Sequence, residues 1–396
     1  MVGKDLIMQT LLGGGSSGES GGGSSGGGGG AVAVSPKEVN FYDYDGTCVH
    51  AYTVAEAQKL SALPDSPEHD GLVFQGWNWS LEGVNGLTRA MNIGAMYTTD
   101  DGTTRLYITL QEGRTSPMLG VGVNGTVTVD WGDGTEPDVL TGTSTSTTKW
   151  TQNHAYAKPG DYVIRLTVDG NMVFVGDGMS ETYASILRHA SSADSRNQAY
   201  QSAIKRVEIA DNVKSIGNYA FYNCSSLAYL TIPDSVTGIG GNAFRYCSSL
   251  AYLTIPDNVT SIGDSAFRSC SSLSLLTIPK SVTKFETYAF RECRSLSLLT
   301  IPDNVTSVSS MFYSCPSLSF LVIPGGVSDI TSSAFYSCGS MAVCDFTACT
   351  IVPTLANINA FTDIPDDCEI RVPAALYDEW IAATNWATYA NQIKAY

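Results

Sequence analysis

The sequence has little positive charge, few charged residues of any kind and no long apolar run. Lys and Arg number 22 against 38 Asp and Glu, so the formal net charge is −16, and charged residues make up 15% of the chain. Phosphate backbones and anionic lipids repel such a chain, which argues against nucleic acid or a membrane surface as partner. No apolar run approaches the ~18–20 residues that a membrane-spanning helix needs, so no membrane insertion is expected.

Motifs of catalysis and metal binding are also scarce. The four histidines (His50, His69, His154 and His189) have no serine, cysteine or carboxylate at a recognisable catalytic spacing. The ten cysteines include no C-x-x-C pair of the kind that holds zinc. We therefore expect no catalytic residues, no metal and no cofactor. A glycan-degrading enzyme with two acids in a cleft is the remaining enzymatic alternative.

The N-terminal 36 residues divide into a short apolar peptide and a flexible tether. Residues 1–12 contain the apolar side chains, and residues 13–36 are rich in Gly and Ser, which is typical of a flexible linker. The start does not resemble a secretory signal, because Lys4 alone supplies positive charge and an acidic residue follows it. The peptide is either an anchor that docks into a partner assembly or a frayed terminus. The anchor residues would be Leu6, Ile7, Met8, Leu11 and Leu12.

Residues 37–87 are predicted to form a small, aromatic-rich α+β module. Apolar and aromatic residues at 39–44 and 74–79 favour two strands. Between them, residues 53–60 favour a short helix whose N-cap is Thr53. The segment 43–46 contains two aspartates but lacks the further ligands of a calcium loop, so we interpret it as a hairpin turn.

Residues 88–203 are predicted to form an antiparallel sandwich followed by a connector. Apolar and polar residues alternate at 105–110, 125–130 and 162–168, between turn signals. The segments W-G-D-G-T at 131–135 and H-A-Y-A-K-P-G-D-Y at 154–162 resemble the signatures of PKD domains, an immunoglobulin-like family. That resemblance implies a spacer or adhesion domain in which both segments are structural.

From residue 204 to 396 the chain is periodic. One cysteine and one phenylalanine recur every 22 or 23 residues, and a fixed period of this size marks a leucine-rich repeat. The two series are Cys224, Cys247, Cys270, Cys293, Cys315 and Cys338, and Phe221, Phe244, Phe267, Phe290, Phe312 and Phe335. Because these cysteines fall among core-type residues, we expect buried, reduced thiols, with Cys344 and Cys349 as a local pair to watch. Residues 374–392, with Trp380 and Trp386, should form a helical cap.

The repeat consensus A-F-x-x-C-x-x-L-x-x-L-x-I-P-x-x-V-x-x-I resembles BspA-like leucine-rich repeats, which occur in surface proteins and adhesins. The predicted fold class is therefore mainly β and multidomain, with an immunoglobulin-like sandwich followed by a leucine-rich-repeat solenoid and a helical C-terminal cap. The resemblance implies a role in surface interaction.

The candidate binding site is the outward side of the repeat strands. An aromatic and aliphatic column lies beside a column of hydroxyl residues, and together they would suit a sugar ring or a protein partner. The alternative is that strand faces favour such residues in any case. The first column is Tyr229, Tyr252, Leu275, Leu298 and Phe320; the second is Thr231, Thr254, Thr277, Thr300 and Val322.

The order of modules also resembles predicted virion proteins of gut bacteriophages. This order, the anchor peptide and the tether predict a non-enzymatic head-fibre, decoration or tail-fibre protein at the virion surface. Its N-terminus would bind the virion or another assembly, and its repeats a host-surface glycan or protein. The alternative is a bacterial cell-surface adhesin of the BspA type. Whether the chain forms a homo-oligomer stays open.

Overall fold

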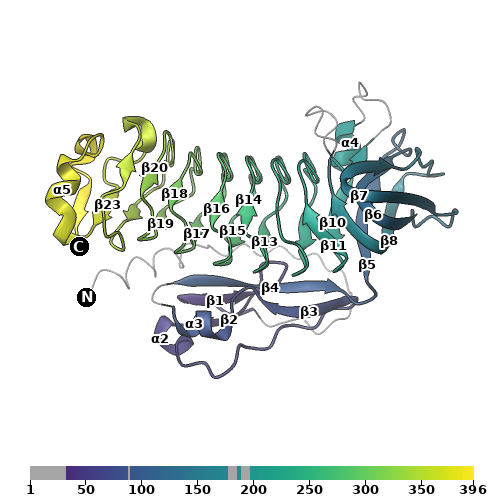
Figure 1. Ribbon diagram of the computed structural model, residues 1–396, viewed down its shortest axis with the longest axis horizontal. Helices are drawn as coiled ribbons and strands as arrows, with labels where there is room; N and C mark the ends of the chain where they lie inside the picture. The colour runs from purple at the N-terminus through teal and green to yellow at the C-terminus, as the bar shows by residue number, and fades with distance from the viewer. Residues whose placement is uncertain (1–32, 88–89, 177–184, 189–196) are drawn as a thin grey trace, which may run out of the picture.

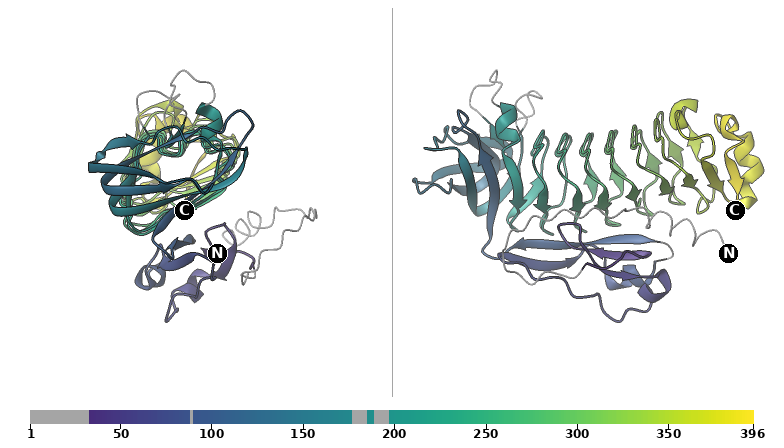
Figure 2. Two further views of the ribbon diagram at one scale, coloured as in Figure 1. Left: turned by 90° about the vertical axis from the view of Figure 1, so that its right-hand side faces the viewer. Right: turned by 180° about the vertical axis from the view of Figure 1, so that it is seen from behind.

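The protein is a row of stacked rungs with a β domain at one end, a helical cap at the other and a small module along one side (Figure 1). The computed structural model describes residues 33–87, 90–176, 185–188 and 197–396. In a view down the solenoid axis and in a view from behind, the module lies against the same side of the solenoid as in Figure 1 (Figure 2). The predicted anchor peptide and most of the tether lie outside the described residues.

The module contains a four-stranded sheet with the strand order β2-β1-β4-β3. β4 pairs in parallel with β1 and antiparallel with β3, which places it inside the sheet. The core is aromatic: the rings of Phe41 and Trp77 lie 4.9 Å apart at their centroids. The strands are β1 (Val39–Tyr42), β2 (Cys48–Tyr52), β3 (Leu72–Trp77) and β4 (Met91–Thr99).

Two short helices complete the module. The helix predicted at 53–60 is present as α2 (Val54–Ala57), and Thr53 with Glu56 forms a capping box at its start. A second helix, α3 (Leu81–Asn85), begins after the N-cap Ser80. The predicted hairpin turn at 43–46 is confirmed, since it joins β1 to β2.

The predicted module boundary at residue 87 is wrong. β4 falls within the range 88–203 that is predicted for the sandwich and connector, but its backbone pairs with β1 and β3, and every residue along it is buried. A strand belongs to the sheet whose strands share its backbone hydrogen bonds. The module therefore extends to Thr99, and residues 100–102 alone separate it from the next strand.

The β domain does not form a sandwich separate from the repeats. Its strands belong to a sheet with the order β12-β10-β5-β8-β6-β7, in which β10 and β12 are already the first rungs of the solenoid. The immunoglobulin-like arrangement is thus not confirmed, although the three predicted strand segments are present in β5, β6 and β8. The strands are β5 (Thr103–Leu110), β6 (Met118–Asp130), β7 (Asp138–Trp150), β8 (Gly160–Phe174), β9 (Leu187–Arg188), β10 (Ile204–Glu208) and β12 (Tyr229–Thr231).

The two segments that resemble PKD signatures pack against each other around Trp131, which is fully buried. His154 stacks on the Trp131 indole with ring centroids 4.6 Å apart, and its Nε2 lies 2.8 Å from Asp133 Oδ2. Tyr156 donates its hydroxyl hydrogen to the Trp131 carbonyl over 2.8 Å. This geometry agrees with the structural role that was predicted for both segments, while membership of the PKD family stays a prediction.

The β domain closes the N-terminal end of the solenoid through backbone pairing. β10 pairs antiparallel with β5, and β11 (Val213–Ile216) pairs in parallel with β8. Side chains of both parts share one hydrophobic core, which runs from Leu106 in β5 to Ile393 near the C-terminus. The short helix α4 (Asn197–Gln201) directly precedes β10.

The rungs of the solenoid contribute short parallel strands to a first row, and the middle rungs contribute a further strand to a second row. The first row is β12, β13 (Tyr252–Thr254), β15 (Leu275–Thr277), β17 (Leu298–Leu299), β19 (Phe320–Val322), β21 (Val343–Asp345), β23 (Glu369–Val372) and β24 (Ile393–Ala395). The second row is β14 (Ser261–Ile262), β16 (Lys284–Phe285), β18 (Ser307–Val308), β20 (Asp329–Ile330) and β22 (Thr354–Leu355).

The phenylalanine series forms a continuous stack inside the solenoid. From Phe221 to Phe335, neighbouring rings lie 5.3–5.9 Å apart and within 6–14° of parallel. All six rings are fully buried. At the C-terminal end Phe335 stacks on Phe361, which in turn contacts Trp386 of the cap.

The cysteine series is also internal, as predicted. All ten cysteines of the chain lie in the described part, and all are free and buried. From Cys247 to Cys338 each thiol reaches the phenylalanine carbonyl of the preceding rung; the Sγ of Cys270 lies 3.0 Å from Phe244 O. Burial raises the pKa of the Cys270 thiol to about 12. Cys344 and Cys349 form no disulfide.

The predicted C-terminal cap is confirmed. It consists of η2 (Ala374–Leu376), α5 (Tyr377–Ala382) and η3 (Trp386–Tyr389), after η1 (Ile358–Phe361) of the last rung. Trp380 and Trp386 are fully buried, and Trp386 Nε1 donates to Pro353 O over 2.8 Å. β24 then pairs with β23, so the final strand also belongs to the stack.

Replacing Phe267 by Ala should destabilise the protein by about 3–5 kcal/mol, because it opens a cavity between two stacked rings. Phe244 and Phe290 contact this ring from either side. Urea unfolding followed by circular dichroism measures the change. The exposed Thr283 provides the control, since Thr283→Ala should shift stability by less than about 0.5 kcal/mol. Equal stability of the two variants would contradict a structural role for the phenylalanine stack.

Candidate functional site

The predicted binding columns lie on the first row of strands, and the N-terminal module is docked on that same surface. β4 runs across the strands β12, β13 and β15, and both figures show the module beneath this part of the solenoid (Figures 1 and 2). The N-terminal half of the predicted site is therefore an internal interface.

The prediction that this part of the strand face is exposed is wrong. Tyr252 is 5% exposed, and Thr231, Thr254 and Thr277 are 4%, 7% and 1% exposed. The physical reason is coverage by β4 and its neighbours in the N-terminal module, which are distant in the sequence. Tyr229, at the edge of the interface, is 45% exposed. Its binding role, like that of the other members of both columns, stays a prediction.

The remaining predicted residues are at or beyond the margin of the module. Leu275 packs partly against Tyr42, Cys48 and Tyr252. Thr300, Phe320 and Val322 are half-buried, and the side chain of Leu298 lies outside the described part of the structure.

Asn78 supplies the central polar contact of the interface. It is fully buried, and its Nδ2 donates to Ile255 O and to Thr277 Oγ1, over 3.2 Å in both cases. Its Oδ1 accepts a hydrogen bond from the backbone N of Gly94 over 2.8 Å. The amide therefore joins β4 to two successive rungs, and it leaves neither of its polar atoms unpaired in the interface.

Gly94 allows β4 to approach the threonine column closely. A Cβ at this position would lie 2.0 Å from Thr254 Oγ1 and 2.6 Å from Thr277 Oγ1. Real Cβ atoms do not approach neighbouring atoms so closely, so any larger residue would push β4 away from the solenoid. The glycine is needed for contact between two surfaces, which is a known use of glycine within strands.

Tyr252 provides the apolar part of the interface. Its ring lies 5.9 Å from that of Tyr42, and the two tyrosines form a buried cluster with Cys48. Its hydroxyl lies 2.8 Å from Thr254 Oγ1, so the polar end of the side chain is also satisfied. Tyr252 is thus a core residue between the two parts of the protein.

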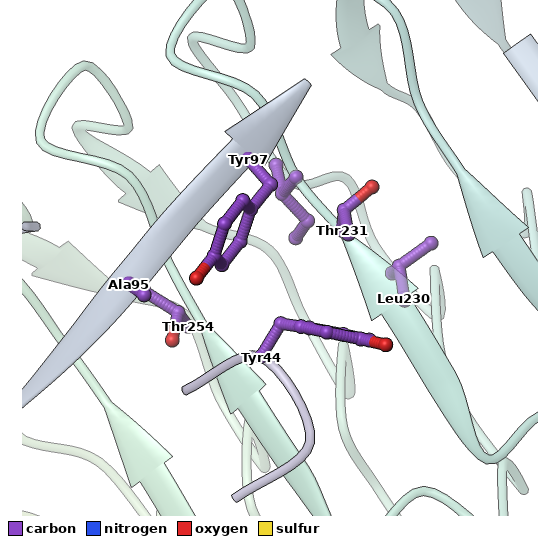
Figure 3. Close-up of a pocket in the computed structure, with 7 residues that line it drawn as sticks. Tyr44, Ala95, Tyr97, Leu230, Thr231 and Thr254 are labelled. Atoms are coloured by element: carbon purple, nitrogen blue, oxygen red, sulfur yellow. The ribbon is translucent and has the colours of Figure 1, made fainter. Parts of the chain in front are cut away.

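The hairpin turn of the module is held by a buried carboxylate. Asp43 Oδ2 lies 2.9 Å from His69 Nε2, and Asp43 Oδ1 accepts a hydrogen bond from the Tyr97 hydroxyl over 3.0 Å. Burial raises the pKa of the Asp43 carboxyl above its usual range. Tyr44 and Tyr97 face Leu230, Thr231 and Thr254 across a cavity of about 10 Å³ (Figure 3). This space is about that of one water molecule, so the interface is closely packed.

Further hydrogen bonds lie at the edge of the interface. The Gln75 side chain donates to Asp211 Oδ1 over 2.9 Å and accepts the backbone N of Asp234 over 3.0 Å. Arg105, just after the module, donates to Gly71 O and pairs with the buried Glu208, over 3.1 Å each. These bonds hold the module at both its far strand and its connection to β5.

The residues of this interface were missed by sequence reasoning, although one signal was present. Apart from Asn92, the segment 91–97, M-N-I-G-A-M-Y, is apolar on both alternating sides, and it contains a central glycine. Continuous apolar character is typical of a strand that is covered on both faces. An internal glycine in such a strand indicates close approach of another chain segment. Neither observation identifies the segment that approaches.

Comparison with known proteins identifies the repeats. Residues 195–311 and 308–362 match the family described as BspA type Leucine rich repeat region, in six copies. This match confirms the predicted leucine-rich-repeat nature of the solenoid. No curated protein matches the chain.

Several solved structures are similar to part of the chain. The T. pallidum Leucine Rich Repeat protein TpLRR is 30% identical over 35% of this chain and 66% of its own, with a TM-score of 0.33. A leucine-rich repeat protein from Bacteroides ovatus is 26% identical over 41% and 47%, with a TM-score of 0.32. A leucine rich cell surface protein from Faecalibacterium prausnitzii is 24% identical over 42% and 60%, with a TM-score of 0.28. The chain thus spans 47–66% of the length of these three proteins.

No helix among the described residues is both long and apolar enough to cross a bilayer. Within the same ranges, no group of three or more His, Cys, Asp or Glu side chains is arranged to hold a metal ion.

The native protein should resist alkylation at all ten cysteines near neutral pH. Burial disfavours the thiolate, which is the reactive form, and raises the pKa of Cys48 to about 11 and that of Cys224 to about 12. Iodoacetamide labelling followed by peptide mass spectrometry measures this protection, and labelling in urea provides the reference. Rapid labelling of any rung cysteine in the native state would contradict the buried thiol series.

Replacing Gly94 by Val should detach the module and make Cys48 reactive, while the nine cysteines from Cys224 onward stay protected. The added side chain cannot fit beside Thr254, whereas the solenoid core does not include Gly94. The same labelling experiment measures the effect. Gly339→Ala is the matched control, because no atom lies within 4 Å of a Cβ at that glycine. Protection of Cys48 in Gly94→Val would show that β4 does not seat on the threonine column.

Proposed function

We propose that this protein is a non-enzymatic binding protein of the bacterial cell surface, of the adhesin type, whose solenoid contacts the ligand. The observation that supports this proposal is the run of six BspA type repeats, because leucine-rich repeats generally serve as binding surfaces rather than as catalytic sites. The predicted alternative, a BspA-type adhesin, is thus the favoured interpretation.

The architecture suits such a role. Each rung contacts mainly its neighbours, so the solenoid is a rigid rod that presents repeated side chains at regular intervals. The β domain and the helical cap cover its two ends. The long sides of the rod are therefore the surfaces that a partner can reach.

The docked module restricts which side is available. It covers the strand face from β12 to β15, and a ligand could use that part only if the module moved away. Phe320 and Val322 of β19, which are half-buried, and the turns between rungs remain for binding. A soluble ligand would therefore not contact Thr231, Thr254 and Thr277, which the module covers, but other residues of the solenoid.

The virion interpretation depends on other observations. It rests on the module order and on the predicted anchor and tether, and residues 1–32 lie outside the described part. The repeats themselves would serve a virion fibre as well as a cell-surface adhesin. Location distinguishes the two interpretations directly.

Protease shaving of intact cells from the source culture, followed by quantitative mass spectrometry, tests the proposed location. Peptides of the solenoid should be released from intact cells, and the protein should be enriched in the envelope fraction. A cytosolic protein of the same culture serves as the control for lysis. Co-purification with capsid protein in density-purified particles, in a fixed ratio, would overturn the cell-surface proposal and support the virion interpretation.

A further inference from the structure

The turns that follow the phenylalanines form a second regular surface of the solenoid. Backbone hydrogen bonds hold successive turns in register: Tyr246 N donates to Arg268 O over 2.9 Å, and Ser269 N donates to Arg291 O over 2.8 Å. Glu292 N continues the series to Tyr313 O over 2.8 Å. Side chains at equivalent positions are therefore neighbours, about 4.8 Å apart, the usual distance between paired strands.

From Phe244 onward, the residue directly after the phenylalanine is arginine in three consecutive rungs and tyrosine in the next two. Together with one neighbouring tyrosine, these residues form what we call the arginine–tyrosine ridge. Its members are Arg245, Tyr246, Arg268, Arg291, Tyr313 and Tyr336. All six side chains are half-buried, so each shows part of its surface to solvent.

Stacking contacts order the side chains of the ridge. The guanidinium carbon of Arg245 lies 4.8 Å from the ring centroid of Tyr246, and that of Arg291 lies 4.3 Å from Tyr313. The rings of Tyr313 and Tyr336 are parallel within 9°, with centroids 4.9 Å apart. A ligand that bound here would therefore meet side chains that have already lost much of their conformational freedom.

The ridge has an excess of positive charge on an acidic protein. Three arginines occupy successive rungs, although like charges on neighbouring strands repel. Glu292 lies among them. Its Oε1 accepts a hydrogen bond from Arg291 Nε over 2.9 Å and a longer one from Arg268 Nη2 over 3.4 Å. Arg294, which is exposed, follows in the same turn. Asp363 hydrogen-bonds Tyr336 at the other end of the ridge, and the two carboxylates together offset only part of the charge of the four arginines.

Arg268 retains unused hydrogen-bonding capacity. Among the described residues its guanidinium donates to Glu292 Oε1 through Nη2, whereas Nε is unpaired but buried and so does not face a ligand from solution. The Arg268 side chain is 23% exposed. A planar guanidinium binds carboxylate and sulfate groups with two parallel hydrogen bonds, which a neutral sugar hydroxyl cannot match.

We propose that the arginine–tyrosine ridge binds an acidic polysaccharide, a glycan chain with carboxylate or sulfate groups, that lies along the solenoid axis. The arginines bind the acidic groups, and the tyrosine rings offer flat apolar surfaces to the sugar rings. Because rungs repeat at roughly the length of one sugar residue, successive units of the glycan can meet successive rungs. This inference rests on the proposed surface-binding function and names its ligand class.

The ridge remains available while the module is docked. The module contacts the first-row strands and the residues that follow them, such as Thr254, Ile255 and Thr277. The ridge belongs to the turns between β12 and β21, which precede the next first-row strand in each rung. Binding at the ridge therefore does not require the module to leave.

Isothermal titration of the full chain with polygalacturonate and with chondroitin sulfate tests the proposal, with dextran as the neutral control. We expect binding of at least one acidic polymer, weakened by added salt, and no binding of dextran. The triple variant Arg245→Gln, Arg268→Gln, Arg291→Gln should lose about tenfold or more in affinity. The matched control Lys214→Gln, Lys280→Gln, Lys284→Gln removes the same charge from exposed lysines elsewhere on the solenoid and should keep its affinity.

Two further variants separate shape from charge. Arg268→Lys keeps the charge but loses the planar fork, and should weaken binding of the acidic glycan. If the triple variant does not fold, Arg268→Lys alone still tests whether the ridge binds the acidic glycan. Tyr313→Leu removes the aromatic surface and should weaken the acidic glycan but not poly-glutamate, a peptide polymer of similar charge.

Several results would overturn the proposal. The first is that neither acidic polymer binds. The second is that the triple arginine variant and the triple lysine variant lose affinity equally. The third is that poly-glutamate binds as tightly as the glycans. None of them would affect the cell-surface location, which the shaving experiment decides separately. Conversely, a protein found in virions could still bind acidic glycans through the ridge.

Discussion

Backbone hydrogen bonding between rungs is the constraint on which the rest of the structure depends. A stack of parallel strands leaves unpaired N–H and C=O groups at both ends, and such edges would recruit other chains. At the N-terminal end β5 and β8 accept β10 and β11, and at the C-terminal end β24 and the tryptophan cap follow β23. The β domain is therefore part of the solenoid fold rather than a spacer before it, and one hydrophobic core extends through both.

Once the rungs are held in register, each repeat position becomes a column of neighbouring side chains. Inward columns must be filled by groups that stack on copies of themselves, which flat phenylalanine rings and small thiols do without gaps. Outward columns are free of that requirement, so their composition can vary with the partner. The threonines under β4 and the arginines after the phenylalanines are two such columns, on different sides of the same rungs.

The sequence was sufficient to predict the features that depend on the 22- or 23-residue repeat. The rungs, the buried cysteines, the phenylalanine core and the cap with Trp380 and Trp386 all follow from contacts about one repeat apart. Contacts between distant segments leave no such signal. The outward direction of Tyr252 was predictable from the strand pattern, but its burial depends on Tyr42 and Cys48, which belong to a different module. Likewise Asn78 bonds to Ile255 and Thr277 across almost half of the chain, and no spacing in the sequence links these residues.

The two outward columns suit different kinds of partner for a thermodynamic reason. The module is joined to β5 by residues 100–102 alone, so it is held next to the strand face at an effective concentration on the order of mM or higher. Small neutral contacts, such as Gly94 against Thr254, are then sufficient to keep it docked. A ligand from solution must also offset its loss of translational and rotational freedom, so it needs stronger individual contacts. Preordered arginines and stacked tyrosines provide such contacts, whereas a column of threonine hydroxyls does not.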